Sequence, residues 1–435
     1  MIKRVLRAMI DVRNPKRGRE SRLGRASWYA YYAGFSTTFV RDALQHASPK
    51  PQARILDPWN GSGTTTEIAA SLGFETLGFD LNPAMVIVAK ARLLDYTVRP
   101  SLSSILDDVL NKARQLEYAD SDEPLAAWLT PNSAAAFRRF ERAPQTVLIN
   151  PRKYWPLFSL PRLQDVPSLA AFFYVAAFRV LRELLISFRS ANPTWLKQPG
   201  ATERVALREA RLHEMLREQA NIMAADLAAP VSGAFRKRAV TIEKAASGSL
   251  PVNESSVDVV IASPPYCTRI DYVRKTSPEL ALLGANATDV KSLRDQMIGT
   301  PTINKQTPQQ ERTWGTACID VMDRIFHHNS YASRSYYWKT YAQYFNGLYQ
   351  SLREIDRTLK PAGTCILVAQ DSYFKDVHID LAKIIDEMAW GLSWTDVARA
   401  DFPTARTMVG VNTQARENGN PQNAIETVLS FRKTR

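Results

Sequence analysis

Residues 53–81 read ARILDPWNGSGTTTEIAASLGFETLGFDL, and this stretch decides the fold. It contains a short apolar strand, a tight loop with two glycines, a helix and a second strand, and a second helix is expected shortly after it. We expect these five elements at Ala53–Leu56, 57–63, 64–72, 75–79 and 84–94. Alternation of strands and helices in this order predicts a parallel, doubly wound α/β sheet.

The remaining strands of the sheet are expected in the C-terminal half of the chain. Residues 256–262, SVDVVIA, form an apolar run typical of a strand buried on both faces. Further downstream the pattern predicts a helix, a strand, a helix and a closing strand at 336–359, 364–369, 376–388 and 426–431. Residues 100–239 differ, because they contain long helical stretches such as 166–191 and no strand followed by a glycine loop.

We therefore divide the chain into four parts. Residues 1–25 are expected to be a flexible basic arm, and residues 26–99 the first part of the sheet domain with the glycine loop. Residues 100–239 are expected to be a large helical insertion, and residues 240–435 the rest of the sheet domain. The length of 435 residues suits a core with one sizeable insertion.

The net charge of +13 is concentrated in two segments. Residues 1–54 hold 12 Lys and Arg against 3 Asp and Glu, and residues 131–250 hold 18 against 9. Such patches favour a polyanion, because Lys and Arg release the counterions condensed on phosphates. Nucleic acid is thus the expected partner, with a generally basic surface as the alternative.

Other features restrict the class of protein. No apolar run reaches the roughly 18 residues of a membrane span, and the N-terminus lacks the apolar segment of a secretory signal, so we expect a cytoplasmic location. Cys267, Cys318 and Cys365 lie far apart in the sequence. This spacing indicates neither a disulfide framework nor a zinc site, and no metal ligands are predicted.

The glycine loop is suited to binding a ligand at the end of its strand. Gly61 and Gly63 allow a sharp turn and let backbone N–H groups approach a ligand. Asp57 can accept a hydrogen bond from an ammonium group, and Asp80 can hold ribose hydroxyls. The loop lacks the third glycine of a dinucleotide motif and the Lys of a phosphate loop, so NAD and ATP are less favoured. A turn without any ligand is the competing interpretation.

A second loop, Ser263-Pro264-Pro265-Tyr266, follows the apolar strand at the sheet edge where ligands bind in such folds. The two prolines lack N–H groups and fix the backbone, so the carbonyls are rigid acceptors. Such acceptors suit a ligand that presents an amino group, because they can receive its N–H hydrogen bonds. An ordinary proline loop is the alternative for this motif taken alone.

These motifs resemble those of S-adenosylmethionine-dependent DNA amino-methyltransferases, over about residues 28–99 and 250–435. ILDPWNGSGTTT is similar to their methionine-binding motif, GFDLNP to the ribose-binding motif, and WYAYYAGFSTTFVRDAL to a preceding helical motif. The resemblance implies a class I methyltransferase fold that binds S-adenosylmethionine. The cofactor-binding residues that it implies are Phe35, Ser36, Thr37, Asp57, Pro58, Trp59, Gly61, Ser62, Gly63, Thr64, Asp80, Leu81 and Asn82.

VDVVIASPPY resembles the catalytic motif of the same family, and RIDYVRKTSPELALLG resembles the segment that follows it in one bacterial group. The resemblance implies that the Ser263 hydroxyl and the Pro264 carbonyl orient the amino group, next to Pro265, while Tyr266 stacks on a base flipped out of double-stranded DNA. A serine in the first position inclines toward cytosine N4. The long helical stretch between the two motifs would be the target-recognition region.

Several alternatives stay open. Adenine N6 methylation is the first, followed by amino methylation of RNA and by a DNA-binding regulator without turnover. Cys267 as a nucleophile for C5 methylation is disfavoured, because that cysteine is expected directly after a proline. Aromatic residues between Tyr331 and Tyr344 are expected in the core rather than on a stacking surface. No nuclease signature is apparent, so a restriction or defence partner would be a separate chain.

The sequence departs from the family at one cofactor position. Many relatives carry an acidic residue that contacts the adenine ring, a few positions before a Leu-Pro pair. Alignment on Leu250-Pro251 places Ala246 there, and Glu243 is the nearest acid.

Overall fold

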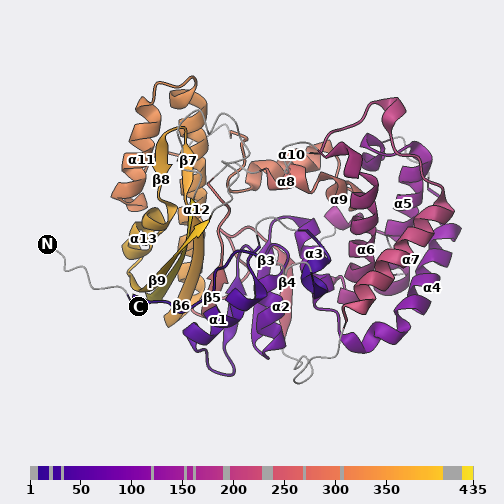
Figure 1. Ribbon diagram of the computed structural model, residues 1–435, viewed down its shortest axis with the longest axis horizontal. Helices are drawn as coiled ribbons and strands as arrows, with labels where there is room; N and C mark the ends of the chain where they lie inside the picture. The colour runs from indigo at the N-terminus through magenta and orange to yellow at the C-terminus, as the bar shows by residue number, and fades with distance from the viewer. Residues whose placement is uncertain are drawn as a thin grey trace.

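An eight-stranded sheet forms the centre of the computed structural model (Figure 1). The structure describes residues 8–18, 23–30, 34–118, 122–150, 154–159, 163–189, 196–227, 239–267, 271–303, 308–404 and 424–434. The strand order is β1-β9-β10-β6-β5-β2-β3-β4. The strands are β1 Ala8–Met9, β2 Arg54–Asp57, β3 Glu75–Asp80, β4 Val240–Lys244, β5 Val257–Ala262, β6 Leu359–Gln370, β9 Trp394–Thr404 and β10 Ala424–Lys433. A separate hairpin pairs β7, Ser372–Phe374, with β8, Val377–Ile379.

The sheet is parallel apart from one strand. β2 pairs in parallel with β3 and β5, β3 with β4, and β5 with β6. Only β10 is antiparallel to its neighbours β6 and β9 among the described strands of this sheet. This is the mostly parallel α/β sheet that the sequence predicts, and the parallel strands β2, β3 and β5 all end at one edge.

Side chains of the central strands alternate between two apolar layers, as the two-residue period of a strand requires. Val259 and Ile261 of β5 pack with α1 and α2, whereas Val260 and Ala262 pack with α11, α12 and α13. Both faces of β5 are thus buried, which explains its continuous apolar sequence. The helices of these layers are α1 Thr37–Ala47, α2 Thr64–Ser71, α11 Thr316–His327, α12 Trp338–Thr358 and α13 Leu381–Gly391.

A third cluster of buried side chains lies in the helical part of the chain. We call α4–α7 the helical lobe; in Figure 1 it lies to the right of the sheet, opposite α11, α12 and α13. Its helices are α4 Leu102–Gln115, α5 Pro131–Pro144, α6 Ser168–Leu184 and α7 Glu209–Ala225. α3, Pro83–Arg92, packs on α6 and so joins the lobe to the sheet. The predicted helical insertion is therefore present in the fold.

Two short helices and a longer one follow the Ser263-Pro264-Pro265-Tyr266 loop and contact the lobe. They are α8 Tyr272–Lys275, α9 Ser277–Leu282 and α10 Ala287–Gln296. The buried guanidinium of Arg138 on α5 donates to the carbonyls of Ala281 and Leu282 at 2.8 and 2.7 Å. On α6, Arg182 forms an ion pair with Glu279, with one contact of 2.7 Å. The lobe thus holds the segment that follows the Ser263-Pro264-Pro265-Tyr266 loop.

The prediction of a flexible N-terminal arm is wrong for residues 8–18. Residues 8–18 are not the free end of a flexible arm, because Ala8–Met9 pairs with Ala398 and Arg399 of β9. Ile10 and Val12 are buried in the layer that contains α1. The arm joins the sheet because an edge strand offers unpaired backbone groups and the arm carries these two apolar side chains. Residues 1–7 and 19–22 of the predicted arm lie outside the described residues.

No helix in the described part of the chain has both the length and the apolar character needed to cross a lipid bilayer.

Candidate cofactor and substrate site

Three parallel strands bring the predicted site residues to one edge of the sheet. Asp57 is the last residue of β2, Asp80 is the last residue of β3, and Ser263 directly follows β5. Because β3, β2 and β5 are neighbours in this order, the loops that follow them lie next to one another. This edge is where open α/β sheets bind ligands.

Hydrogen bonds from the Asp57 and Asp80 carboxylates organise the loops. The Asp80 carboxylate accepts from the backbone N–H of Gly61 at 2.9 Å and from that of Asn82 at 2.8 Å. Asp57 accepts from the N–H of Trp59 at 3.1 Å. Asp80 therefore connects the glycine loop after β2 to the start of α3.

Close packing of α2 against α3 requires glycine at position 63. Gly63 has a φ of +83°, and a Cβ there would lie 2.7 Å from Ala89 Cβ of α3. The neighbouring loop residues are held by Arg92 of α3, which donates to the Ser62 carbonyl at 2.9 Å and to Thr64 Oγ1 at 3.3 Å. The conformation of the loop is thus fixed by α3 as well as by its own sequence.

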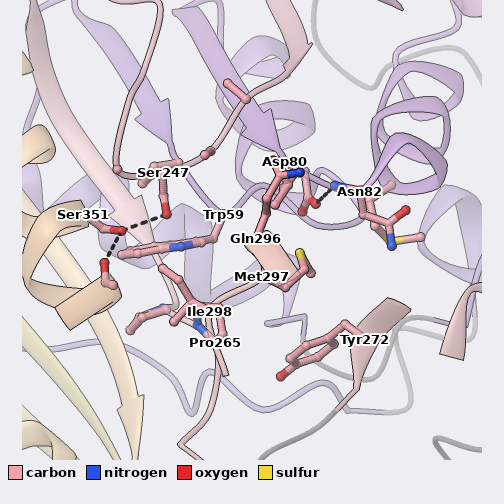
Figure 2. Close-up of a pocket in the computed structure, with 18 of the residues that line it drawn as sticks. Trp59, Asp80, Asn82, Ser247, Pro265, Tyr272, Gln296, Met297, Ile298 and Ser351 are labelled. Atoms are coloured by element: carbon pink, nitrogen blue, oxygen red, sulfur yellow. Dashed lines mark hydrogen bonds between the residues drawn. The ribbon is translucent and has the colours of Figure 1, made fainter. Parts of the chain in front are cut away.

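A cavity of about 230 Å³ opens at this edge (Figure 2). Residues of both predicted motifs line it: Pro58, Trp59, Asp80, Leu81 and Asn82 from the predicted cofactor set, and Ser263, Pro264 and Pro265 from the catalytic set. Two loops that are about two hundred residues apart in sequence therefore share one cavity.

Other predicted site residues lie outside the lining of the cavity. Asp57 is buried and is not part of the lining, and Gly61, Ser62, Gly63 and Thr64 are in the loop and the first turn of α2. Ser36 accepts from the Phe39 N–H and so caps α1, which begins at Thr37, while the Phe35 ring packs on Phe39 with centroids 5.4 Å apart. The structure shows a packing and capping role for Phe35 and Ser36.

The electrostatics of the site fit a cationic ligand. Burial raises the pKa of Asp57 to about 7 and that of Asp80 to about 6. The negative charge of Asp80 adds to the shift at Asp57. No salt bridge joins either carboxylate to a basic side chain within the described residues. S-adenosylmethionine carries a sulfonium and an ammonium group, so its positive charges match these two carboxylates.

The Ser263-Pro264-Pro265 loop is held from two directions. The Ser263 hydroxyl donates to the Val368 carbonyl of β6 at 3.0 Å, and its oxygen lone pairs stay available as acceptors. The Tyr344 hydroxyl of α12 donates to the Pro265 carbonyl at 2.8 Å. Tyr344 is buried, as the sequence predicts, whereas Tyr331 of the same aromatic group is 95% exposed and contradicts that prediction. No pattern indicated that the Tyr344 hydroxyl holds the loop at Ser263–Tyr266.

Tyr266 and Cys267, which follow the two prolines, are not part of the lining of this cavity. Tyr266 forms a hydrogen bond with Glu426 of β10. Burial raises the pKa of Glu426 to about 7. Cys267 is buried, and its carbonyl accepts from the Ser372 hydroxyl at 2.7 Å.

The side of the cavity toward the helical lobe contains residues that the sequence did not single out. Asn82 donates through its amide to Thr276 Oγ1 at 2.8 Å. Lys275 also lines the cavity, and burial together with the charge of Arg182 lowers its pKa to about 8. The sequence pointed to Lys275 and Thr276 only through the segment RIDYVRKTSPELALLG. This segment resembles the family as a whole, and the resemblance assigns no role to its individual residues.

The comparisons with known proteins point to one family. Residues 257–435 match a family model for N6 and N4 methyltransferases, described as DNA methylase. The type II methyltransferase M.BsoBI of Geobacillus stearothermophilus is 24% identical over 296 residues, which cover 65% of this chain and 57% of that relative. The type II methyltransferase M.AvaI of Nostoc is 23% identical over 299 residues, covering 64% and 58%. The chain thus spans little more than half the length of these relatives.

A solved structure, that of the YcgJ protein from Bacillus subtilis, aligns over 91% of this chain and 98% of its own, with 10% identity and a TM-score of 0.30.

The strand order and the ligand edge define an α/β protein with a class I methyltransferase type of fold and helical insertions. Residues 257–435 match the DNA methylase model, so this part of the chain is similar to the N6 and N4 methyltransferases, and about two thirds of the chain is similar to the two type II methyltransferases.

Proposed function

We propose that this protein transfers a methyl group from S-adenosylmethionine to an exocyclic amino group of a DNA base, with cytosine N4 as the target. The observation that carries the proposal is the single cavity lined by Asp80 and Trp59 on one side and by Ser263, Pro264 and Pro265 on the other. A cofactor held at the first set and an amino group held at the second would meet in this space.

The cofactor would be held by residues of the loops after β2 and β3. Asp57 and Asp80 supply negative charge, and Gly61 and Gly63 add no side chain that would obstruct the cofactor. Bound S-adenosylmethionine supplies an electrophilic methyl group. The protein contributes binding, orientation and removal of the reacting groups from water.

Ser263 and Pro264 would orient the amino group of the base. The Ser263 hydroxyl proton is committed to Val368, so its oxygen accepts one N–H of the amino group. The Pro264 carbonyl would accept the other, whereas the Pro265 carbonyl is occupied by Tyr344. Two such acceptors favour the tetrahedral nitrogen that can attack, and no covalent intermediate on the protein is required.

The substrate proposed is double-stranded DNA whose target base is flipped out of the helix. The two basic segments, residues 1–54 and 131–250, would contact the phosphates, and the second of them includes most of the helical lobe. The separate chain of a restriction or defence system is a further proposed partner. The serine at position 263 supports cytosine N4, and adenine N6 is the alternative.

Nucleoside mass spectrometry tests this proposal directly. The purified protein is incubated with DNA and S-adenosylmethionine, and the DNA is digested to nucleosides. We expect N4-methylcytosine, whereas N6-methyladenine would show the alternative target. We expect Ser263→Ala to lower the rate by about 10²-fold, as loss of one transition-state hydrogen bond does, while cofactor affinity stays unchanged. DNA without any methylated base would overturn the proposal.

A further inference from the structure

Ala246 occupies the position where the family resemblance places an acid that contacts the adenine ring. It lies in the turn after β4, and Ala245, Ala246, Ser247 and Gly248 all line the cavity. The nearest acid, Glu243, is not in the lining and interacts with the charge of Lys90 on α3. No carboxylate of this turn is therefore available to an adenine ring in the cavity.

A chain of hydroxyl groups lies at the same turn. The Ser351 hydroxyl on α12 donates to the Gly347 carbonyl at 2.8 Å. Ser247 Oγ and Ser351 Oγ are 2.8 Å apart. A hydroxyl group has a single proton, so Ser351 has none left for Ser247, and Ser247 must donate to Ser351. The Ser247 oxygen then faces the cavity as an acceptor only.

The strand order places this acceptor at the purine end of the cavity. Along the sheet, β5, β2, β3 and β4 follow one another. In the proposed complex, the amino group that receives the methyl lies at Ser263 after β5. The methionine part of the cofactor lies at the loop after β2, and its ribose lies at Asp80 on β3. The turn after β4 lies one strand further, where the adenine would follow its ribose. Figure 2 shows Ser247 and Ser351 on the same side of the cavity as the Trp59 ring.

We propose that Ser247, held by Ser351, accepts the hydrogen bond from the amino group of the adenine of bound S-adenosylmethionine, in place of the expected acid. The inference rests on the proposed function, because it assumes that this cofactor binds in the cavity. Two serines, Ser247 in the turn after β4 and Ser351 on α12, would then select adenine. They would disfavour a purine that has a carbonyl group instead of an amino group at position 6.

Calorimetric binding of two cofactor products tests the inference without any turnover. S-adenosylhomocysteine has an amino group at purine position 6, whereas S-inosylhomocysteine has a carbonyl oxygen there. We expect the wild type to bind the adenosyl compound about tenfold more tightly, the size of one hydrogen bond in a binding constant. Ser247→Ala should weaken the adenosyl compound about tenfold and leave the inosyl compound unchanged.

Ser351→Ala should reduce the adenosyl preference in a different way, by changing the binding of the inosyl compound. It frees the Ser247 proton to donate to a carbonyl, so binding of S-inosylhomocysteine should become tighter and the preference should shrink. Ser256→Ala is the control, because that hydroxyl donates to the Asn253 carbonyl at 2.7 Å and is outside the cavity. It should leave both binding constants unchanged.

The outcomes separate the inference from the function on which it rests. A wild-type protein that binds neither compound would overturn the proposed function. Binding of both compounds, with the adenosyl preference retained in Ser247→Ala and in Ser351→Ala, would overturn the inference alone. Loss of the preference in Ser247→Ala supports it, and Ser351→Ala decides if Ser247→Ala does not fold.

Discussion

Asp57 and Asp80 have pKa values of about 7 and about 6, far above that of an exposed aspartate. Burial is the main cause, because it disfavours the charged carboxylate. Between about pH 4 and pH 7 the folded protein therefore binds more protons than the unfolded chain. The free energy of unfolding of the ligand-free protein should fall as the pH rises through this window.

Cofactor affinity should change in the opposite direction with pH. The ionised carboxylates attract the sulfonium and ammonium groups, so binding of S-adenosylmethionine should tighten as the pH rises from about 5 to 8. Calorimetry across this range measures the change. Asp57→Asn should bind the cofactor more weakly and with a shallower pH dependence. An affinity that is independent of pH in the wild type would contradict this electrostatic account.

At the residue scale, the sequence indicated the site through motifs but not through contacts. Asp80 is the last residue of an apolar strand and Ser263 directly follows another, so their position at the ligand edge was predictable. The hydrogen bonds of Tyr344 and Ser351 were not, because α12 reaches the site only through packing of distant elements. Tyr266 was expected over a flipped base, and in the structure it bonds Glu426; its role in stacking stays a prediction.

Among the elements, the loop between β2 and α2 depends on its second glycine. Gly63→Ala should destabilise the protein by about 1–3 kcal/mol, because it combines a positive φ with overlap onto Ala89. Cofactor affinity should fall as well, since α3 must shift. Urea unfolding and calorimetry measure both effects.

Gly391→Ala at the end of α13 is the matched control. A Cβ there would have its nearest neighbour at 3.9 Å, and the φ is not positive. This variant should behave like the wild type. Equal stability and equal cofactor affinity for Gly63→Ala would show that α2 and α3 can separate at no cost.

Elements with strong periodicity were predictable, and those that depend on pairing were not. The apolar strand β5 and the long helix α12 lie close to their expected limits. β9, with the sequence WTDVARADFPT, was missed because polar residues and Pro403 interrupt any alternation, and the strand exists through its pairing with β10. β1 has two residues and could be found only from its partner β9.

At the scale of the whole molecule, we expect stability to depend on the contacts between the helical lobe and the segment that follows the Ser263-Pro264-Pro265-Tyr266 loop. Arg138 is 3% exposed and forms ion pairs with Glu123 and Glu141 at 2.9 and 3.1 Å. Arg138→Met should cost about 3–5 kcal/mol, because it leaves two buried carboxylates without their partner. Hydrogen exchange at α8 and α9 should increase, since the carbonyls of Ala281 and Leu282 lose their donor.

An exposed arginine in the same lobe provides the comparison. Arg211 pairs with Glu214 and Glu218 on the surface of α7. Arg211→Ala should leave unfolding and hydrogen exchange unchanged, because water replaces the lost contacts. If Arg138→Met unfolds at the same urea concentration as Arg211→Ala, the lobe does not depend on this buried network.

The pairing of Ala8 with Ala398 has a consequence for how the chain is made. A ribosome must synthesise Ala398 before Ala8 has its partner, and β5 joins β2 only after the helical lobe has emerged. Contacts so distant along the chain slow folding. We expect the nascent lobe to gain structure first, and the edge that β1 and β9 share to form only after β9 has been synthesised.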